Sequence, residues 1–413
     1  MYPNSQDVLP LPPRPDPHHY RKRAKDLARA CRSGDADAIR RWAAQWIGDL
    51  LSLHPGADSA ADLSAADPRI DLVARFARER LADDCALSRA QFVIARAHGF
   101  ESWPKLAAHL DALSGCGSPV SAFEEAADAI VEGDAPHLRR LLRESPELVR
   151  ARSTREHRAT LLHYVSANGV ENFRQETPPN IVEIATILLD AGAEVDAEAE
   201  VYGGGATALG LLVTSAHPRA AGVQNELADL LLARGARLRA GIVRDCLLNG
   251  CPEAAEHVAA RGAPVDLQEA AGLGRVDLVR RHLESAPPRE KLVAALITAA
   301  WYGRRDVAAL LLDHGVEPGA RDAEGKTALH VAAYLAHVAL AELLVERGAP
   351  LDVVDDRYGT PPMVWAMHAW LVEKKRGRDD DYRAVLRLLA RAGATIEPDW
   401  LDDERVRDAL AAA

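Results

Sequence analysis

The sequence predicts an all-α fold in which short helix pairs stack side by side into a solenoid. The first observation is a repeat, because Gly315 and Gly348, and likewise Thr327 and Thr360, stand 33 residues apart. Periods of about 20 to 50 residues are typical of solenoids and related arrays. The second observation is length, since 413 residues exceed what a single hydrophobic core usually holds. A quasi-linear array accounts for both observations.

The clearest copy of the repeat covers residues 322–354. It opens with a turn that contains Gly325, and two short apolar-periodic segments follow. Thr327 is placed to cap the first helix with its hydroxyl group. Ala332 and the alanine after it let neighbouring helices approach closely, and Gly348 is expected to end the second helix in a left-handed conformation. Each of these residue types therefore favours a helix pair.

This stretch, with its TALH helix start at 327–330, resembles one ankyrin repeat. The resemblance implies an ankyrin-repeat solenoid of about eight repeats, in which helix pairs are joined by short finger turns. It also implies that the motif histidine, His330, hydrogen-bonds the backbone of the neighbouring repeat. A second helix start of this kind, TLLH at 160–163, predicts the same role for His163.

Two further stretches resemble bacterial ankyrin-repeat proteins of unassigned activity. Residues 87–110 (LSRAQFVIARAHGFESWPKLAAHL) are similar to a segment that precedes the repeats in many such proteins. Residues 162–169, followed by NFRQETPPN and YGGGATALGLL, are similar to the repeats of the same group. The resemblance suggests a bacterial origin and implies no reaction.

Composition shifts and the phase of the repeat divide the chain into four regions. The proline-rich start has too few apolar residues to order itself, and the charged end is expected to cap the stack. Insertions lengthen three repeats, and insertions at the same place in consecutive repeats project from the same edge. The predicted regions are a disordered tail at 1–19, a helical N-terminal region at 20–114, the array at 122–397 with insertions at 169–180, 216–223 and 373–381, and a cap at 398–413.

Charge and cysteine usage restrict the class of protein. A net charge of −11 argues against a nucleic-acid partner, and no apolar run approaches the ~18 residues that a membrane span needs. The first 20 residues lack the apolar core of a secretory signal. Five cysteines, an odd number without a framework spacing, predict reduced thiols and a cytoplasmic location. No cysteine and histidine spacing matches a zinc site, so the sequence predicts no metal and no cofactor.

The first functional hypothesis is a scaffold that holds another protein. By the resemblance, the residues just before the end of each first helix point into a concave groove, and in the C-terminal half they are aromatic. Aromatic residues are enriched at interface hot spots. The alternative is that these rings pack against one another within the stack. Trp365 and Trp370 differ in phase from Met367 and are expected to face the core or neighbouring helices. The predicted partner-binding residues are Trp301, Tyr302, Tyr334, Leu335, Met367 and His368.

The second hypothesis is a small-molecule or catalytic site on the enlarged repeats around 157–217, where polar residues are dense. Histidine and tyrosine can transfer protons, and Gly203–Gly205 would allow close approach of a ligand. The candidate residues are His163, Tyr164, Asn168, Arg174, Tyr202 and His217.

A structural reading of these residues competes with the chemical one. His163 occupies the motif position, Gly203–Gly205 fall in a finger turn that needs positive φ, and His217 lies in a loop. The scaffold is therefore the favoured function and an enzyme the less favoured one. The predicted partner is another protein, without nucleic acid or membrane, and the oligomeric state stays open.

Overall fold

A computed structural model describes residues 7–12, 15–52, 68–114, 117–373 and 377–411. The chain divides into two compact units. Unit 1 comprises Met1–Arg237 with Asn249–Ala254, and unit 2 comprises Leu238–Leu248 with Ala255–Ala413. Within the described residues, every helix is too short or too polar to cross a membrane.

Unit 1 begins with a bundle of five helices. Asp16 caps the first helix by accepting a hydrogen bond from the backbone N–H of His18, and proline follows at the first helical position. Leu27, Trp42 and Trp46 are buried in the bundle core, and the two indole rings lie 5.1 Å apart. The helices are α1 (Pro17–Arg32), α2 (Ala38–Ser52), α3 (Pro68–Leu81), α4 (Leu87–Ala97) and α5 (Trp103–Ser114).

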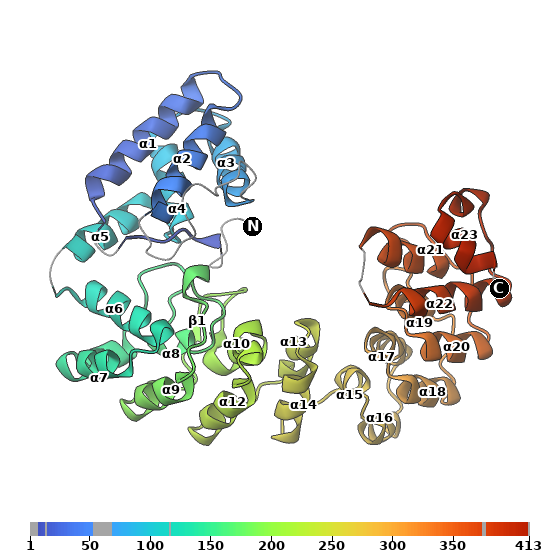
Figure 1. Ribbon diagram of the computed structural model, residues 1–413. Helices are drawn as coiled ribbons and strands as arrows, with labels where there is room; N and C mark the ends of the chain where they lie inside the picture. Colours follow the sequence, from blue (N-terminus) through green and yellow to red (C-terminus); the bar gives the residue numbers. More distant parts are fainter. Residues whose placement is uncertain (1–6, 13–14, 53–67, 115–116, 374–376, 412–413) are drawn as a thin grey trace. The chain divides into compact units, whose positions relative to one another are not determined.

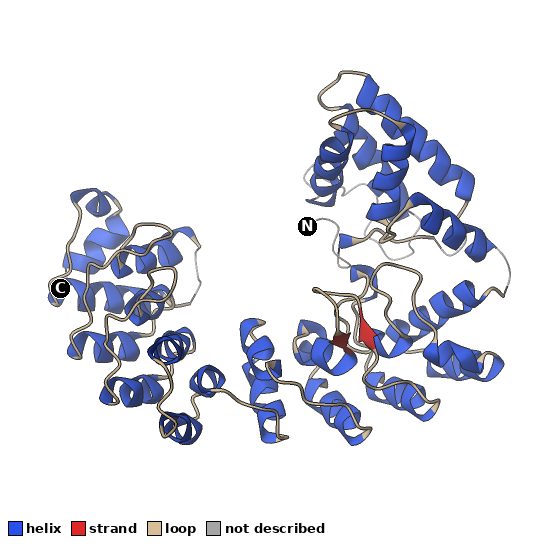
Figure 2. Cartoon of the chain, turned by 180° about the vertical axis from the view of Figure 1, so that it is seen from behind, coloured by secondary structure: helices blue, strands red, loops and turns tan. Residues whose placement is uncertain are grey.

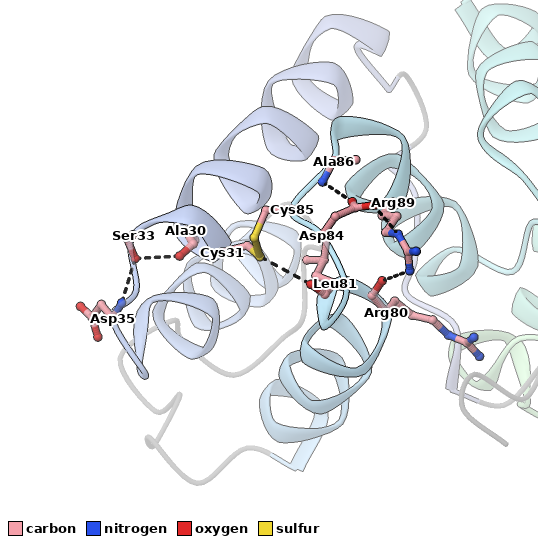
Figure 3. Close-up of a disulfide and its surroundings, with 10 residues drawn as sticks. All are labelled: Ala30, Cys31, Ser33, Asp35, Arg80, Leu81, Asp84, Cys85, Ala86 and Arg89. Atoms are coloured by element: carbon pink, nitrogen blue, oxygen red, sulfur yellow. Dashed lines mark hydrogen bonds and ion pairs between the residues drawn. A yellow bond between two sulfur atoms is a disulfide. The ribbon is translucent and has the colours of Figure 1, made fainter.

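A disulfide joins Cys31 at the end of α1 to Cys85 in the connection between α3 and α4, as Figure 3 shows. The two Cα atoms lie 5.7 Å apart, and the bond closes a loop across 54 residues. The prediction of reduced thiols throughout is therefore wrong for this pair. The sequence pattern did not reveal it because the partners are distant in the chain and have no framework spacing. Cys246 and Cys251 are buried thiols, and Cys116 lies outside the described residues.

The prediction of a disordered tail at 1–19 is wrong for the part that the structure describes. Val8 and Leu9 are buried. Leu9 donates its backbone N–H to the carbonyl of Ala97 at 2.7 Å, and its own carbonyl lies 2.9 Å from Nδ1 of His98. Two aliphatic side chains with paired backbone groups are enough to fix this short segment, although the prolines around it lower the average apolar content.

Helix pairs follow the bundle within unit 1, and α5 packs against the first of them. Ser118 caps α6, and Gly133 ends it with φ of 77°. One two-stranded antiparallel ribbon is present among the described residues. The elements are α6 (Pro119–Glu132), α7 (Ala135–Glu144), η3 (Pro146–Arg150), α8 (Leu161–Tyr164), η4 (Asn172–Arg174), α9 (Ile181–Asp190), β1 (Glu198–Ala199), β2 (Ala206–Thr207), α10 (Ala208–Val213), α11 (Ala216–Ala220) and α12 (Gln224–Ala233).

The first insertion, residues 169–180, folds back against the preceding repeat. Arg174 reaches Glu124 and Asp128 on α6, and the side-chain amide of Asn180 donates to the carbonyl of Gly133. The second insertion forms the short helix α11 between α10 and α12. The first insertion thus fills space beside α6 in addition to lengthening its own repeat.

Unit 2 continues the helix pairs in two layers, which Figures 1 and 2 show from opposite sides. The first helices α15, α17, α19 and α21 pack in sequence against one another, and so do the second helices α16, α18, α20 and α22. A continuous apolar core rich in leucine, valine and alanine lies between the layers. The elements are α13 (Ile242–Leu248), α14 (Pro252–Ala260, which belongs to this unit from Ala255 on), α15 (Leu267–Leu273), α16 (Val276–Leu283), α17 (Arg289–Trp301), α18 (Arg305–Asp313), α19 (Ala328–Tyr334), α20 (Val338–Glu346), α21 (Pro362–Met367), the π-helical turn η5 (His368–Val372), α22 (Asp379–Arg391), η6 (Pro398–Asp402) and α23 (Glu404–Ala411).

The motif residues of the best repeat do what the sequence predicts. The hydroxyl of Thr327 accepts from the backbone N–H of His330, and Nδ1 of that histidine accepts from the backbone N–H of Thr327. Nε2 of His330 lies 3.2 Å from the carbonyl of Thr360 in the next repeat. Burial lowers the pKa of His330. Gly348 has φ of 79°, as expected for a left-handed helix end.

The third predicted insertion, 373–381, is described only in part, because 374–376 lie outside the described residues. Its last residues begin helix α22. At the end of the chain, α23 lies against α22, and Val406 and Ala409 join the core. The charged outer residues of α23 therefore cover an apolar layer.

Candidate partner-binding site

Four aromatic rings line a pocket on unit 2, which we call the aromatic pocket. The rings belong to Trp301 at the end of α17, Tyr334 at the end of α19, Trp365 in α21 and Tyr358 in the finger turn before α21. Centroid distances are 6.1 Å for Trp301 to Tyr334, 5.8 Å for Tyr334 to Trp365 and 6.1 Å for Trp365 to Tyr358. Each pair is T-shaped, so adjacent walls stand nearly at right angles.

The repeat places two of these rings side by side. Trp301 and Tyr334 are 33 residues apart and each is the last residue of its first helix. Trp365 reaches the pocket for a different reason. It occupies the repeat position of Ala299 and Ala332, which are fully buried where neighbouring helices meet. An indole is too large for such a contact. Its ring lies instead 5.4 Å from that of His330 and lines the pocket.

Asp355 holds the finger turn and the indole of Trp365. Its buried carboxylate accepts hydrogen bonds from the backbone N–H groups of Arg357, Tyr358 and Thr360 and, at 3.1 Å, from Nε1 of Trp365. Burial raises the pKa of Asp355, but these hydrogen bonds outweigh burial and lower the pKa to about 2. The Asp355 carboxylate is therefore ionised, and its hydrogen bonds are made within the protein.

A second carboxylate, that of Glu373, stands at the side of the pocket. The hydroxyl of Tyr334 lies 2.8 Å from both of its oxygens, and Nε2 of His368 lies 3.6 Å from Oε1. Burial and the hydrogen bond to Glu373 raise the pKa of Tyr334 to about 12. The phenol is thus a neutral donor to the Glu373 carboxylate.

Two basic side chains also line the pocket, and both have partners. Nζ of Lys326 lies 2.9 Å from Oε2 of Glu324 and 3.4 Å from Oδ2 of Asp322. The guanidinium carbon of Arg357 lies 5.3 Å from the ring centroid of Tyr358. The lining therefore carries three carboxylates and two cations, with one negative charge in excess.

An aliphatic hollow lies next to the aromatic pocket, with Trp301 in the lining of both. Leu247, Leu248 and Ile297 contribute its apolar surface, and Tyr302 closes one side. The aromatic pocket encloses about 450 Å³ and the hollow about 470 Å³. Each volume is in the range of about 300 to 1,000 Å³ that binding sites occupy.

Comparison with known protein families identifies the region that contains the two cavities. The family described as ankyrin repeats (3 copies) matches residues 246–355 and, in an overlapping second match, residues 296–396. This region is an ankyrin-repeat array. The predicted fold class, an all-α ankyrin-repeat solenoid with an additional helical region, is confirmed.

A curated relative supports the assignment over a shorter stretch. An ankyrin repeat-containing protein of Schizosaccharomyces pombe is 39% identical over 66 residues. The alignment covers 16% of this chain and 32% of the relative, so the two share about a third of the relative's length. Ankyrin repeats are generally protein-interaction modules, because stacked repeats present an extended surface.

The ankyrin array brings together only part of the predicted partner-binding set. Trp301, Tyr334 and His368 line the aromatic pocket, and Tyr302 lines the aliphatic hollow. Leu335 packs against the core.

The prediction for Met367 is wrong, because this side chain is 8% exposed and belongs to the core. In the two preceding repeats the residue two positions after the end of the first helix, Gly303 or Ala336, has positive φ. The equivalent position, Ala369, instead lies within the π-helical turn η5, where the backbone N–H of Glu373 bonds the carbonyl of His368. The helix therefore runs on, and Met367 turns inward.

Trp365 packs against His330 and Tyr334 of the neighbouring helix α19, as expected, and it also lines the aromatic pocket, which was not predicted. Trp370 is buried as expected. Tyr358 and Glu373 were not predicted as site residues. A signal for Trp365 existed, namely a tryptophan in register with two alanines. Glu373 had none, because its place depends on the continued helix.

The residues proposed for a chemical site around 157–217 are divided among separate groups. Arg174 belongs to a buried ion network with Glu124, Arg155 and Glu171, and His157 lies 3.3 Å from Glu171. Burial raises the pKa of Glu124, but Arg155 and Arg174 outweigh burial and lower the pKa to about 2. These four charged side chains pair with one another within unit 1.

Of the other candidates in that region, Tyr164 contacts the same network through Glu171, and the rest have different partners. Nε2 of His163 lies 3.2 Å from the carbonyl of Ala206, as the motif predicts, and burial lowers its pKa to about 4. Asn168 donates to the carbonyl of Leu211 and accepts from the hydroxyl of Tyr202 at 2.8 Å. The hydroxyl of Tyr164 is 3.5 Å from Oε1 of Glu171, and His217 is exposed on α11.

Proposed function

We propose that this ankyrin array binds a protein partner through the aromatic pocket and the aliphatic hollow of unit 2. The observation that carries the proposal is the position of Trp301. Its ring is 38% exposed and takes part in the lining of both cavities. An aromatic anchor between two adjoining cavities is the arrangement that interface hot spots use.

The exposed apolar side chains nearby support a polypeptide ligand. Leu248 and Tyr358 are exposed although both are large and apolar, and each belongs to one of the two cavities. Exposed hydrophobic surface with a polar rim marks interaction sites on soluble proteins. The charged groups beside the aromatic rings provide such a rim.

The first step of the test is to crosslink a partner protein at a defined position of the array. Tyr302 is replaced by p-benzoylphenylalanine, and the full chain is irradiated in an extract of its source cells. A crosslinked protein is then purified, and its affinity for the unmodified chain is measured by isothermal titration calorimetry. We expect Trp301→Ala to weaken binding at least tenfold, since an aromatic hot spot contributes about 2 kcal/mol or more.

The control is Leu401→Ala, because Leu401 has the same exposed fraction of 38% and lies in η6, outside both cavities. This variant should bind as the unmodified chain does. Equal affinities of the Trp301→Ala variant and the unmodified chain would reject this surface as the binding site.

A further inference from the structure

We propose that the Cys31–Cys85 disulfide of unit 1 is a reversible thiol switch, which a low-molecular-weight thiol opens by attacking Cys31 and releasing Cys85 as a thiolate. The inference goes beyond the proposed function, because it concerns the helical bundle and not the cavities of unit 2. It is supported by the position of the bond at the edge of the bundle core, by the unlike surroundings of the two sulfur atoms, and by the packing of the helices that carry them.

The disulfide lies at the edge of the bundle, outside its packed centre. Cys31 and Cys85 are both partly exposed, whereas Leu27 and Ala28, about one turn earlier in α1, are fully buried. Thiol–disulfide exchange requires a thiolate to reach one of the two sulfur atoms. A small thiol can therefore react with this bond while the bundle stays folded.

The surroundings of Cys31 favour a neutral thiol over a thiolate. Its Sγ lies 3.9 Å from the carbonyl oxygen of Leu81, as Figure 3 shows. A thiol can donate to this oxygen, whereas a thiolate would be repelled by it. Cys31 also lies in the last turn of α1, at the negative end of the helix dipole. Of the two basic residues in that turn, Arg29 pairs with Asp26 at 3.0 Å, and Arg32 is the next residue in the helix, so its side chain does not face Cys31.

The surroundings of Cys85 favour a thiolate. Cys85 lies two residues before the start of α4, at the positive end of that helix. Arg89, in the first turn of α4, lies 3.2 Å from Asp83 and 3.2 Å from Asp84, and it offsets these two carboxylates, which solvent also screens. The cysteine that forms the more stable thiolate is the better leaving group. Cys85 is therefore the sulfur that departs, and Cys31 is the sulfur that is attacked.

Opening takes two exchange steps and two thiol molecules. In the first step, a thiolate attacks Sγ of Cys31 and forms a mixed disulfide, while the original bond breaks and its electron pair leaves on Cys85. In the second step, another thiolate attacks the sulfur of the bound thiol molecule, and Cys31 leaves. The protein disulfide is thereby reduced to two thiols, and the two thiol molecules are oxidised to one disulfide. The two protons that these molecules lose to water return to the two cysteines.

The switch can close again because other contacts keep the two cysteines near each other. Helix α1 packs against α2 and α4, and its buried residues Ala24 and Leu27 belong to the same apolar core as Val93 and Ile94 of α4. None of these side chains depends on the sulfur atoms. Reclosure is thus intramolecular, and the disulfide of the same small thiol can drive it. Opening should loosen the end of α1 and the connection at 82–86.

The experiment locates the mixed disulfide in the full chain. Free thiols are first blocked with N-ethylmaleimide, reduced glutathione is added as the probe, and early samples are quenched with acid and alkylated with deuterated N-ethylmaleimide. Peptide mass spectrometry should find glutathione on Cys31 in about fivefold excess or more over Cys85, with the deuterated label on Cys85. Equal amounts of glutathione on the two cysteines, or an excess on Cys85, would overturn the proposal.

A variant tests the leaving group. Arg89→Ala removes the cation that offsets the two carboxylates before Cys85, and it should slow reduction by glutathione about threefold. Arg140→Ala is the matched control, because Arg140 pairs with Glu144 at the surface of α7, outside the bundle, and its reduction rate should equal that of the unmodified chain. Circular dichroism checks that both variants are folded. Equal reduction rates of the two variants would contradict the choice of Cys85 as the leaving group.

Two further measurements distinguish a switch from reduction through unfolding. The reduction rate should rise in proportion to the glutathione concentration and stay nearly constant in low urea. A rate that levels off with glutathione, or rises steeply with urea, would mean that the bundle must unfold first, and the proposal would be rejected. After reduction, hydrogen exchange should rise at the end of α1 and at 82–86, and it should return on addition of glutathione disulfide. A rise throughout the five helices of the bundle, or a rise that does not reverse, would also reject the switch.

Discussion

Glu124 shows how a single buried carboxylate can organise a large part of unit 1. Its two oxygens receive Arg155 and Arg174, which come from different segments of the second repeat. Burying any of these charges alone would be costly, and the network is stable only as a set. The polar density that the sequence shows in this region therefore has a structural explanation.

Removal of the Glu124 charge should destabilise the protein strongly. We expect Glu124→Gln to lower the free energy of unfolding by about 3 to 5 kcal/mol, because two buried guanidinium groups lose a common partner. Urea denaturation followed by circular dichroism measures the change. The comparison is Glu183→Gln, whose exposed ion pair with Arg139 is worth about 0 to 1 kcal/mol. Similar losses in the two variants would contradict the network.

The same residue predicts a pH dependence. The pKa of Glu124 falls from an ordinary value of 4.5 to about 2 in the folded protein. A depressed folded pKa means that its stabilisation is complete above pH 4.5 and is lost as the pH falls from 4.5 toward 2. Unfolding free energies measured across this interval should decline less steeply in Glu124→Gln than in the unmodified chain. Parallel curves would assign the acid sensitivity to other groups.

Asp355 combines a structural role with a role at the aromatic pocket. Asp355→Ala removes the acceptor for three backbone N–H groups and for the Trp365 indole. We expect a loss of about 1.5 to 3 kcal/mol in stability, typical for hydrogen bonds to a charged group, together with a shifted Trp365 signal in ¹⁹F NMR of the chain labelled with 5-fluorotryptophan. Asp356→Ala changes the exposed neighbour and should leave that signal in place.

At the scale of elements, the disulfide fastens α1 to the connection that precedes α4. Cys31→Ser with Cys85→Ser should lower stability by about 2 to 4 kcal/mol, because the reduced chain gains freedom in the unfolded state. Denaturant melts with and without dithiothreitol measure this loss. The unmodified chain should respond to the reductant, and the double variant should not. An identical response of both proteins would place the effect elsewhere.

The clearest helix pair was predictable because it carries its own local signals, namely a capping threonine, paired alanines and a terminal glycine. The aromatic pocket was predictable only where the 33-residue period holds, as for Trp301 and Tyr334. Met367 was placed incorrectly, because the π-helical turn η5 changes how the first helix of the last repeat ends. Such a change depends on packing between repeats, which a local pattern does not contain. The same holds for the disulfide, whose partners meet only after the bundle folds.

At the scale of the molecule, stacked repeats transmit a defect mainly to their neighbours. Leu311→Ala in α18 empties a fully buried site and should cost about 2 to 5 kcal/mol locally. Hydrogen exchange measured by mass spectrometry should rise in α18 and in α16, α17 and α20, which pack against it or its pair. Peptides from α3 and α4 should keep their rates. A uniform rise throughout the chain would indicate one cooperative unit in place of an array.

The inward-folded segment 169–180 makes the first two repeats inseparable. Arg174 on this segment pairs with Glu124 and Asp128 on α6, so charges of one repeat are matched by charges of the other. Excising the opening helix pair would remove Glu124 and Asp128 and leave Arg155 and Arg174 to share one buried carboxylate, that of Glu171. Swapping or duplicating that module would separate the same charges.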